Sequence, residues 1–465
     1  MKFNINTTSK QVLSDTLTPV GIYLKFRDVY PNTVLLESSD YHGSKGSWSF
    51  ICAKPIANFI VEKGKITEHF PDGTSSVTHA NSEISVTARL DLFRQAFICK
   101  GDSVPVNGLF GYMSFDSIEY FEQIKFKSEI EDSRQIPEVF YSFYKYIIAV
   151  NHFHNSLLII ENLLSHEKSE IEKIETLLQS RNFAVYPFKT NKDEVSNHSD
   201  EQYMQMVTKG KESCKRGDVF QIVLSRRYRQ TYTGDDFNVY RALRSINPSP
   251  YLFYFDYGSF RMFGSSPEAE LEIKSGKAYI HPIAGTFKRT GNDEEDKKLA
   301  EQLSQDKKEN AEHVMLVDLA RNDLSRDTNQ VIVETYREIQ YFSHLLHMVS
   351  KVSGVLPEKF NPVQVLADTF PAGTLSGAPK FKAMELIDKY EGDRRGYYGG
   401  CIGYLGFNRD CNHAIMIRSF LSKNNTLFYQ AGAGIVLESK EENELNEVKN
   451  KLAALKSALI LAEGI

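Results

Sequence analysis

The chain has 465 residues, of which 41% are hydrophobic and 25% charged, so it holds enough apolar material for one large domain or two smaller ones. Its formal net charge of -5 gives no basic surface of the kind that nucleic-acid-binding proteins use. The N-terminal segment has no apolar signal core, no apolar run approaches 18 residues, and the five cysteines form no Cys-x-x-Cys framework. We therefore expect a cytoplasmic protein with free thiols and without nucleic-acid or membrane partners.

Strand-like runs dominate the first 190 residues. They occupy residues 33–36, 49–52, 146–150 and 157–160, and a helical pattern covers residues 169–180. The polar segment 187–200 is a change of composition typical of a linker or a long surface loop. We divide the chain there into an N-terminal part (residues 1–190) and a C-terminal part (residues 200–465).

The C-terminal part alternates between helical patterns and short strands. Helices are predicted at 201–216, 296–324, 378–389 and 441–461, and strands at 220–224, 251–255, 261–264, 398–405, 413–421 and 427–432. In the last helix a buried stripe is predicted, with Glu444, Glu447 and Lys451 off it; the stripe consists of Leu445, Val448, Leu452, Leu455 and Leu459. This mixture predicts an α+β fold in which packed β-sheets are flanked by helices.

Two Glu-x-x-Glu pairs lie in helical segments far apart in the chain. Glu309 precedes Glu312 by three residues, and Glu444 precedes Glu447 in the same way, with Lys451 one turn later. Residues three and four apart share a helix face, so converging helices would present carboxylate oxygens suited to Mg²⁺ beside a lysine for an anionic substrate. The alternative is two solvated acidic helix faces.

Glycines and single polar residues mark further candidates. Gly285 and Thr286 break a strand and offer a close backbone approach and a hydroxyl, while Gly432 and Gly434 do the same in a later strand. The segment 373–380 precedes a helix, but it lacks the spacing of a phosphate-binding loop. Arg418 interrupts an apolar strand and suits a carboxylate, and His347 is a candidate acid or base; in a strand His344 would point to the opposite face. Together these residues fit a small dicarboxylate held with Mg²⁺.

The chain resembles a known family through many ordered motifs after residue 217. They are Gly217-Asp-Val-Phe-Gln-Ile-Val, Asn247-Pro-Ser-Pro-Tyr251, Ser266-Pro-Glu268, Pro282-Ile-Ala-Gly-Thr286, Glu312 to Leu324, Asp368 to Lys380, Arg395 to Gly400 and Gln430-Ala-Gly-Ala-Gly434. The N-terminal part matches chiefly at Leu35 to Ser38. The family is that of the chorismate-utilising enzymes, and within it the component I chains of anthranilate synthase.

The resemblance implies roles for individual residues. It implies Glu312 and Glu447 as Mg²⁺ ligands, with Glu309 and Glu444 holding metal-bound water, and His347 as the acid or base. The positions that match those holding the substrate's carboxylates are Tyr398, Arg418, Lys451, Thr374 and the backbone at Gly285, Gly432 and Gly434, with Thr286 as a further hydroxyl donor. The family fold is a large sandwich of paired sheets flanked by helices.

Two positions distinguish among the reactions of the family. Relatives that add water to chorismate carry a lysine at the position of Gln221, and a glutamine cannot act as a base at neutral pH. Aminodeoxychorismate synthases usually carry a nucleophilic lysine at the position of Ala284. The resemblance therefore implies direct attack by ammonia on chorismate, giving anthranilate; aminodeoxychorismate synthase component I and a catalytically silent binding subunit are the alternatives.

Partners and regulation are also implied by the resemblance. The chain has no cysteine in a glycine-rich nucleophile elbow, so a glutamine amidotransferase subunit would supply ammonia within a hetero-oligomer. Glu37 and Ser38, together with Pro250, Tyr251 and Leu252, resemble the site at which such enzymes bind tryptophan as an inhibitor. The alternative for these five residues is an ordinary strand end and turn packed between layers.

Overall fold

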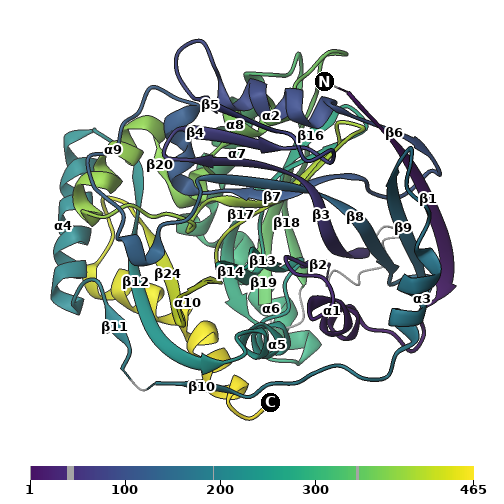
Figure 1. Cartoon of the computed structure of the whole chain (residues 1–465). Coiled ribbons are helices and arrows are strands. Elements are labelled where there is room, and N and C mark those ends of the chain that lie inside the picture. The colour runs from purple at the N-terminus through teal and green to yellow at the C-terminus, as the bar shows by residue number, and fades with distance from the viewer. Residues whose placement is uncertain (1, 39–46, 192, 342–344) are drawn as a thin grey trace.

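Two β-sheets that meet at β3 (Trp48–Glu62) and β8 (Val139–Asn151) form the centre of the molecule (Figure 1). The computed structural model describes residues 2–38, 47–191, 193–341 and 345–465. From β3, the first sheet continues through β2 (Val34–Glu37), β13 (Tyr251–Asp256), β14 (Phe260–Ser266), β23 (Ser419–Lys423), β24 (Thr426–Ile435) and β12 (Gln221–Gly234).

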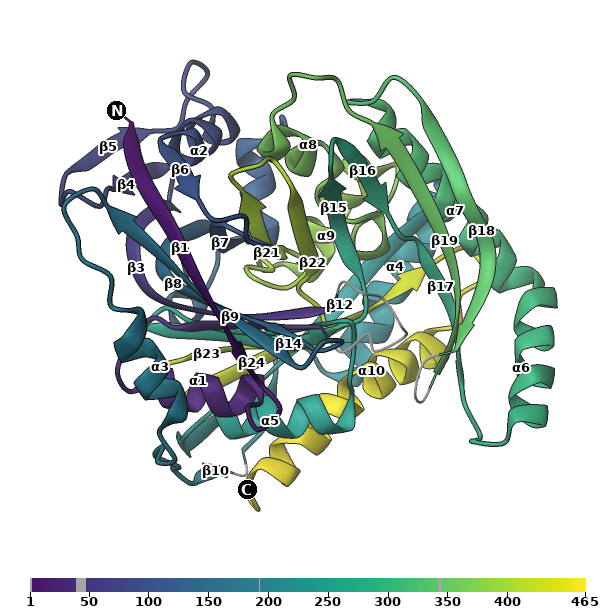
Figure 2. The same ribbon diagram turned by 90° about the vertical axis from the view of Figure 1, so that its right-hand side faces the viewer.

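From β8, the second sheet continues through β7 (Gly108–Met113), β21 (Cys401–Gly406), β22 (Cys411–Ile415), β15 (Ala269–Lys274), β16 (Lys277–Ile280) and β19 (Leu345–Val355). Strand β19 also pairs with β17 (Ile283–Lys288) and β18 (Val331–Tyr341). Figure 2 shows β18 and β19 as long neighbouring strands at one side of the molecule. The remaining strands are β1 (Phe3–Leu13), β4 (Lys65–His69), β5 (Ser75–His79), β6 (Phe97–Gly101), β9 (Ser156–Leu164), β10 (Phe188–Thr190), β11 (Val195–Ser196) and β20 (Gly377–Ala378).

The hydrophobic core is divided into layers, because alternate side chains along a strand belong to different clusters. On β13, Phe253 and Phe255 face a cluster shared with Ile402 of β21 and Ile415 of β22, so this cluster fills the space between the sheets. Leu252 and Tyr254 point the other way. Successive strand residues face opposite sides, so one strand contributes to two layers. Each fully buried large apolar side chain contributes about 1.5–3 kcal/mol relative to exposure.

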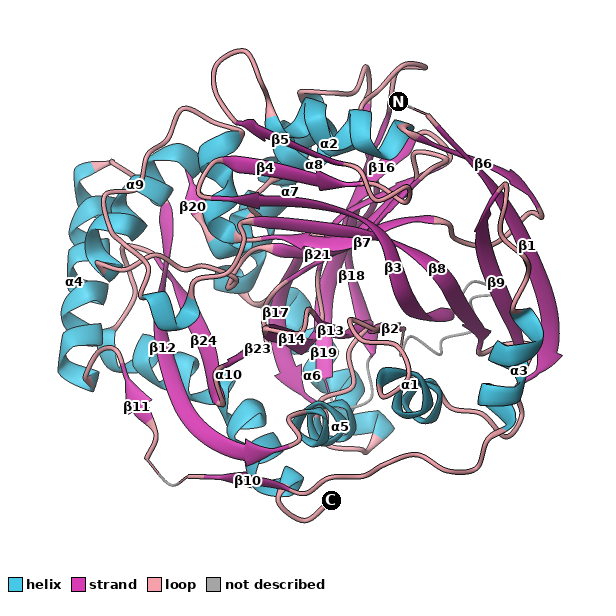
Figure 3. Cartoon of the chain, in the orientation of Figure 1, coloured by secondary structure: helices cyan, strands magenta, loops and turns pink. Residues whose placement is uncertain are grey.

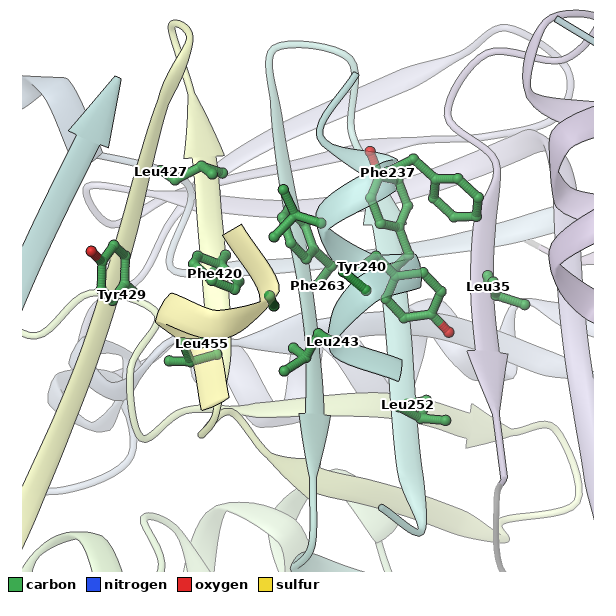
Figure 4. Packing of buried hydrophobic residues seen from close by; sticks show 14 of the residues in the cluster. Leu35, Phe237, Tyr240, Leu243, Leu252, Phe263, Phe420, Leu427, Tyr429 and Leu455 are labelled. Carbon is green, nitrogen blue, oxygen red and sulfur yellow. The ribbon is translucent and has the colours of Figure 1, made fainter. Parts of the chain in front are cut away.

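Helices cover the outer faces of both sheets (Figure 3). The outer face of the first sheet packs against α1 (Pro19–Arg27), α4 (Asp200–Arg216), α5 (Phe237–Ile246), α9 (Lys380–Glu391) and α10 (Glu441–Ala462). The second packs against α2 (Val86–Gln95), α7 (Lys307–Ser325) and α8 (Pro362–Thr369). Figure 4 shows Phe237, Tyr240 and Leu243 of α5 beside side chains of the strands below. The predicted α+β sandwich flanked by helices is confirmed.

Several predicted elements have different bounds. The single helix predicted at 296–324 is wrong: α6 (Asp293–Gln305) ends before Asp306, whose carboxylate accepts the Glu309 N–H at 3.0 Å and so begins α7. The strand predicted at 413–421 is also wrong. It is two strands, β22 and β23, because the chain turns at Arg418, whose φ is 49°. The strand predicted at 220–224 is β12, which continues to Gly234, and the strand predicted from residue 398 begins at Cys401.

The two parts of the chain are interleaved. Strand β2 pairs with β13 and β7 pairs with β21, so N-terminal strands are hydrogen-bonded between C-terminal ones. Within the predicted linker, β10 and β11 both pair with β12. All five cysteines are free thiols, as predicted. Among the described residues, no helix combines the length and the apolar character needed to cross a bilayer.

Candidate functional site

Helix α10 carries the second glutamate pair and Lys451 past the end of β24. The predicted stripe from Leu445 to Leu459 is buried. The prediction that Glu444 lies off the buried face is wrong, since its side chain is only 4% exposed. Glu444 and Glu447 both raise the pKa of Tyr203 on α4, which places them against that helix. Glu444 is therefore covered by α4 rather than by solvent.

Lys451 lies at the open side of α10. Its Nζ donates to the Gly432 carbonyl at 2.9 Å and lies 2.8 Å from a carboxylate oxygen of Glu447. Both side chains are a little under half exposed. An ammonium group fixed at a strand backbone, with part of its surface open, is placed to receive an anion.

Glu268, Thr374 and Arg418 form the centre of the site. The Thr374 hydroxyl, in the short helix η3 (Gly373–Leu375), donates to Glu268 Oε1 at 2.9 Å. Burial raises the pKa of Glu268 to about 7, although Thr374, Lys451 and Arg418 all lower it. Burial lowers the pKa of Arg418 and Glu268 opposes this, so the two groups face each other. A carboxyl that exchanges its proton near neutrality therefore lies between two cations.

Arg418 lies at the end of the turn that joins β22 to β23. Residues 416–418 connect β22 to β23, and the Arg418 carbonyl accepts from the Ser265 N–H at 3.1 Å. The Arg418 guanidinium lies 3.4 Å from the amide oxygen of Asn247. Because Arg418 is in a positive-φ turn rather than within a strand, its side chain is directed toward the junction that Glu268 occupies between β14 and β15.

His347 lies on β19, opposite β17. Its Nδ1 donates to the Gly285 carbonyl at 3.2 Å, so Nδ1 carries the proton and Nε2 the lone pair of the neutral ring. Burial, opposed by the bond to Gly285 and reinforced by the nearby Arg418, lowers the pKa of His347 to about 4, and the effect of Arg418 links this strand pair to the centre of the site. Thr286 is paired with His347 in the sheet, but its side chain, like His344, lies outside the described residues.

Gly285 on β17 allows Glu309, the first residue of the first glutamate pair, to lie close to this strand. Its φ is +67°, and a Cβ built there would lie 3.2 Å from Glu309 Oε2 and 2.6 Å from a methyl group of Leu303. A side chain at this position would displace one of them, so glycine is required for α7 to approach β17. Glu312 follows one turn later on α7 and is half-buried.

Gln221 and Tyr398 complete the predicted set. Gln221 begins β12, is 3% exposed, and its Nε2 would lie 2.6 Å from a Cβ at Gly434. Tyr398 is buried, its pKa is raised by burial, and its hydroxyl lies near the Gly432 backbone. Both residues thus flank the two glycines of β24 that the sequence singled out.

The structure gathers the predicted residues to different degrees. Glu268 interacts with Thr374, Lys451 and Arg418. His347 is connected to this group through its electrostatic interaction with Arg418. In the described part of the chain, no group of three or more His, Cys, Asp or Glu side chains is close enough to hold a metal ion, so the Mg²⁺ site stays a prediction.

The position of Glu268 at the centre of the site is not predicted by the sequence, where this residue stands out only within the motif Ser266-Pro-Glu268. The available signal was a carboxylate at the break between two apolar strands, 260–266 and 269–274. Such a position exposes a strand-end side chain at the edge of a sheet, where sites commonly form.

The predicted tryptophan-binding segments are adjacent. Glu37 on β2 is paired with Leu252 on β13, with Ser38 at the end of the strand and Pro250 and Tyr251 before Leu252. The Glu37 carboxylate accepts from Arg244 Nε at 3.0 Å and from the Tyr240 hydroxyl. The two segments lie where the N-terminal and C-terminal parts of the chain meet, and we call this place the β2–β13 seam. Ligand binding there stays a prediction.

Comparison with known proteins identifies the family. The model of the family described as chorismate binding enzyme matches residues 32–457. The chain belongs to the family of chorismate-binding enzymes. Curated relatives named anthranilate synthase component 1 include one from Aquifex aeolicus, 35% identical over 99% of this chain and 96% of that protein, and one from Lactococcus lactis, 35% identical over 96% of this chain and 98% of that protein.

Solved structures of chorismate-binding enzymes share the fold. Anthranilate synthase component I from Streptococcus pneumoniae matches with a TM-score of 0.77 at 30% identity, covering 96% of this chain and 99% of that one. The menaquinone-specific isochorismate synthase MenF from Escherichia coli matches with a TM-score of 0.74 at 19% identity, covering 98% and 95%, which shows the fold alone. The chain is thus an enzyme of this family, and the curated relatives given above are named anthranilate synthase component 1.

Proposed function

We propose that the chain is the large subunit of an anthranilate synthase, which converts chorismate and ammonia into anthranilate and pyruvate. The observation that carries the proposal is Glu268, a carboxyl with a pKa near 7 held by Thr374 between Arg418 and Lys451. Chorismate is a dicarboxylate with a hydroxyl leaving group, so it needs two cations and an acid. The relatives' names support the same choice.

The chain's own residues account for the first step. Arg418 offers a planar fork and Lys451 a point charge to the substrate's carboxylates. Ammonia forms a bond to C2 of the ring, the double bonds shift, and the C4 hydroxyl leaves as water with a proton from Glu268. A half-buried acid with a pKa of about 7, which is partly protonated at neutral pH, is suited to this transfer.

The second step expels pyruvate. The C2 proton is removed while the bond between the ring and the enolpyruvyl oxygen breaks, giving the aromatic product. His347 is assigned to proton transfer in this step, because its Nδ1–H is fixed on the Gly285 carbonyl and Nε2 carries the lone pair. Its depressed pKa keeps the ring neutral at pH 7.

Mg²⁺ is part of the proposal. Glu312 and Glu447 would be direct ligands, with Glu309 and Glu444 behind them, since carboxylate oxygens are the donors that Mg²⁺ prefers. When bound, the ion would neutralise a substrate carboxylate. The present partner of Glu447 is Lys451, so a metal ligand role would require Glu447 to share its carboxylate.

Two uncharged residues favour ammonia as the nucleophile. Gln221 is no base at neutral pH, and Ala284, buried on β17 opposite Met348, offers no amine for a covalent intermediate. The alternative is aminodeoxychorismate synthase component I, which would release a product bearing its amine at C4.

The ammonia would come from a glutamine amidotransferase subunit. The relatives are named component 1, which supports a second component. We expect the purified chain to use ammonium salt but not glutamine. Tryptophan, bound at the β2–β13 seam, is proposed as the feedback inhibitor.

The test is incubation of the purified chain with chorismate, Mg²⁺ and ammonium salt, followed by chromatographic identification of the product. Anthranilate is expected, with loss of turnover after EDTA treatment and its return on adding Mg²⁺. A 4-amino product would instead establish the alternative, and unchanged chorismate would indicate a silent subunit.

A further inference from the structure

An acidic pocket of about 1220 Å³ lies between the short helix η1 (Phe115–Tyr120), residues 128–138 and residues 394–396. Three cationic side chains line it, against six carboxylates: Asp116, Glu119, Glu122, Glu129, Asp132 and Glu138. A concave surface with an excess of one charge raises the local concentration of the opposite ion. The pocket therefore attracts cations.

Asp116 is a buried carboxylate in this pocket without a full set of partners. It is 4% exposed, and although Oδ2 accepts from the Gly396 N–H at 3.2 Å, Oδ1 has no hydrogen-bond partner among the described residues. The Ser114 hydroxyl, buried in the same wall, also has none there. Buried polar atoms without a partner are costly, so two in one pocket wall point to a ligand.

The two arginines that act on Asp116 are each paired with another carboxylate, although Arg134 Nε has no hydrogen-bond partner among the described residues. Arg394 donates to Glu119 at 2.7 Å, and Arg134 is paired with Asp393. Burial raises the pKa of Asp116 to about 7, Arg394 and Arg134 lower it, and Glu138 raises it. The carboxylate thus lacks an N–H or O–H donor at Oδ1 among the described residues.

The pocket shares a wall with the catalytic site. Phe115 N–H donates to the Gly396 carbonyl at 2.8 Å, and Tyr398 follows two residues later. A Cβ at Gly399 would lie 3.2 Å from the Phe115 ring and 3.6 Å from Leu375, the neighbour of Thr374. The chain neighbour of Asp116, Phe115, and the chain neighbour of Thr374, Leu375, therefore both lie against Gly399.

We propose that this pocket binds ammonium, with Asp116 Oδ1 and the Ser114 hydroxyl oxygen accepting its N–H groups, and that it holds the nitrogen source beside the catalytic site. Ammonium has four N–H donors and one positive charge, which matches two unpartnered acceptors and an excess of carboxylates. The inference rests on the proposed use of ammonia by this chain.

The test is steady-state kinetics with varied ammonium chloride at saturating chorismate and Mg²⁺, with ionic strength held constant by sodium chloride. Asp116→Asn is expected to raise KM for ammonium at least about 5-fold while KM for chorismate changes less than about 2-fold. Asp116→Glu should restore part of the loss. Asp132→Asn, at the exposed rim of the same pocket where solvent screens its charge from Asp116, is the matched control and should change KM for ammonium little.

A second variant decides the question if Asp116→Asn does not fold. Glu138→Gln removes one charge from the pocket, and its amide oxygen can still accept from the Lys63 N–H and the Tyr120 hydroxyl. It should also raise KM for ammonium. In addition, ammonium should raise the wild-type Tm more than sodium does, without chorismate, and this difference should disappear in Asp116→Asn.

The outcomes separate this inference from the proposed function. If the wild type makes no anthranilate from ammonium, the proposed function is wrong, while the ammonium-dependent rise in Tm still tests the pocket. If the wild type makes anthranilate, and Asp116→Asn and Glu138→Gln keep the wild-type KM for ammonium, the pocket is a structural feature and the inference is overturned.

Discussion

At the scale of single residues, burial determines which protonation state each acid or base of the site holds at neutral pH. Glu268 and His347 are both shielded, and burial acts on them in opposite directions because it disfavours the charged form of each. At pH 7 the histidine is neutral, and the glutamic acid exchanges its proton. The two residues therefore suit different proton transfers.

The first prediction concerns the pH dependence set by Glu268. Catalysis needs its protonated form, so kcat/KM for chorismate should fall as pH rises through about 7, when free ammonia is kept constant at each pH. Glu268→Gln should lower turnover by about 10²–10⁴-fold and abolish this alkaline limb. Thr374→Val, which removes a bond that lowers this pKa, should move the limb to higher pH. A limb that persists in Glu268→Gln would contradict the assignment.

The second prediction separates the two chemical steps. His347→Ala should lose about 10²–10⁴-fold in the conversion of chemically supplied aminodeoxyisochorismate to anthranilate, because the proton acceptor of the elimination is removed. The measurement is the rate of anthranilate fluorescence with that compound as substrate. Undiminished turnover would remove His347 from this step.

At the scale of elements, α7 is fixed by a side chain that helix periodicity does not reveal. Asp306 ends α6 and accepts the Glu309 N–H at 3.0 Å, so it determines where the first turn of α7 lies. That turn carries Glu309, and the next carries Glu312. The direction of both carboxylates therefore depends on this cap.

The third prediction follows from the cap. Asp306→Ala should destabilise the protein by about 1 kcal/mol and raise the Mg²⁺ concentration needed for half-maximal activity. Asn292→Ala is the matched control, since Asn292 caps α6 through the Glu294 and Glu295 N–H groups. It should cost similar stability, measured by denaturation, without changing the Mg²⁺ requirement. If both variants raise the Mg²⁺ concentration needed for half-maximal activity equally, the Asp306 cap does not position the Mg²⁺ ligands.

At the scale of the whole molecule, the two parts of the chain are held together by buried charge as well as by strands. Asp393 pairs with both Arg134 from the N-terminal part and Arg227 on β12, whose side chains are 2% and 7% exposed. Because neither arginine is open to solvent, each depends on this carboxylate for charge compensation.

The fourth prediction uses this bridge. Asp393→Asn leaves buried arginine charge uncompensated and should lower stability by about 3–5 kcal/mol in urea denaturation. Asp218→Asn, which breaks the exposed pair with Arg216, should cost only about 0–1 kcal/mol. If Asp393→Asn lowers the free energy of unfolding no more than Asp218→Asn does, the buried ion pairs of Asp393 contribute little to stability.

The fifth prediction concerns the β2–β13 seam. Ser38→Phe should raise the tryptophan concentration needed for half-inhibition, because the larger side chain would occupy space at the strand end beside Leu252. The measurement is anthranilate formation against tryptophan concentration, with chorismate kinetics without tryptophan as the control. Unchanged inhibition would place the regulatory site elsewhere.

While the roles assigned to the site residues stay predictions, the sequence predicted the sandwich and the last helix, because apolar periodicity and ordered motifs are local signals. It missed the division of the 296–324 helix and the turn at Arg418, since a side-chain cap and a positive φ leave no mark on periodicity. Glu268 was passed over because its pKa depends on burial and on groups far apart in sequence. The burial of Glu444 likewise depends on α4, which packs against it only in three dimensions.

The pairing of β7 with β21 has a consequence for synthesis on the ribosome. The two strands are separated by about 290 residues, so β7 leaves the ribosome with one edge unpaired. At roughly 5–20 residues per second, its partner follows only after about 15–60 s. For that time the nascent chain exposes a strand made entirely of buried residues, Gly108 to Met113. This topology therefore leaves an apolar strand edge in the nascent N-terminal part open to chaperones or to aggregation until β21 is made.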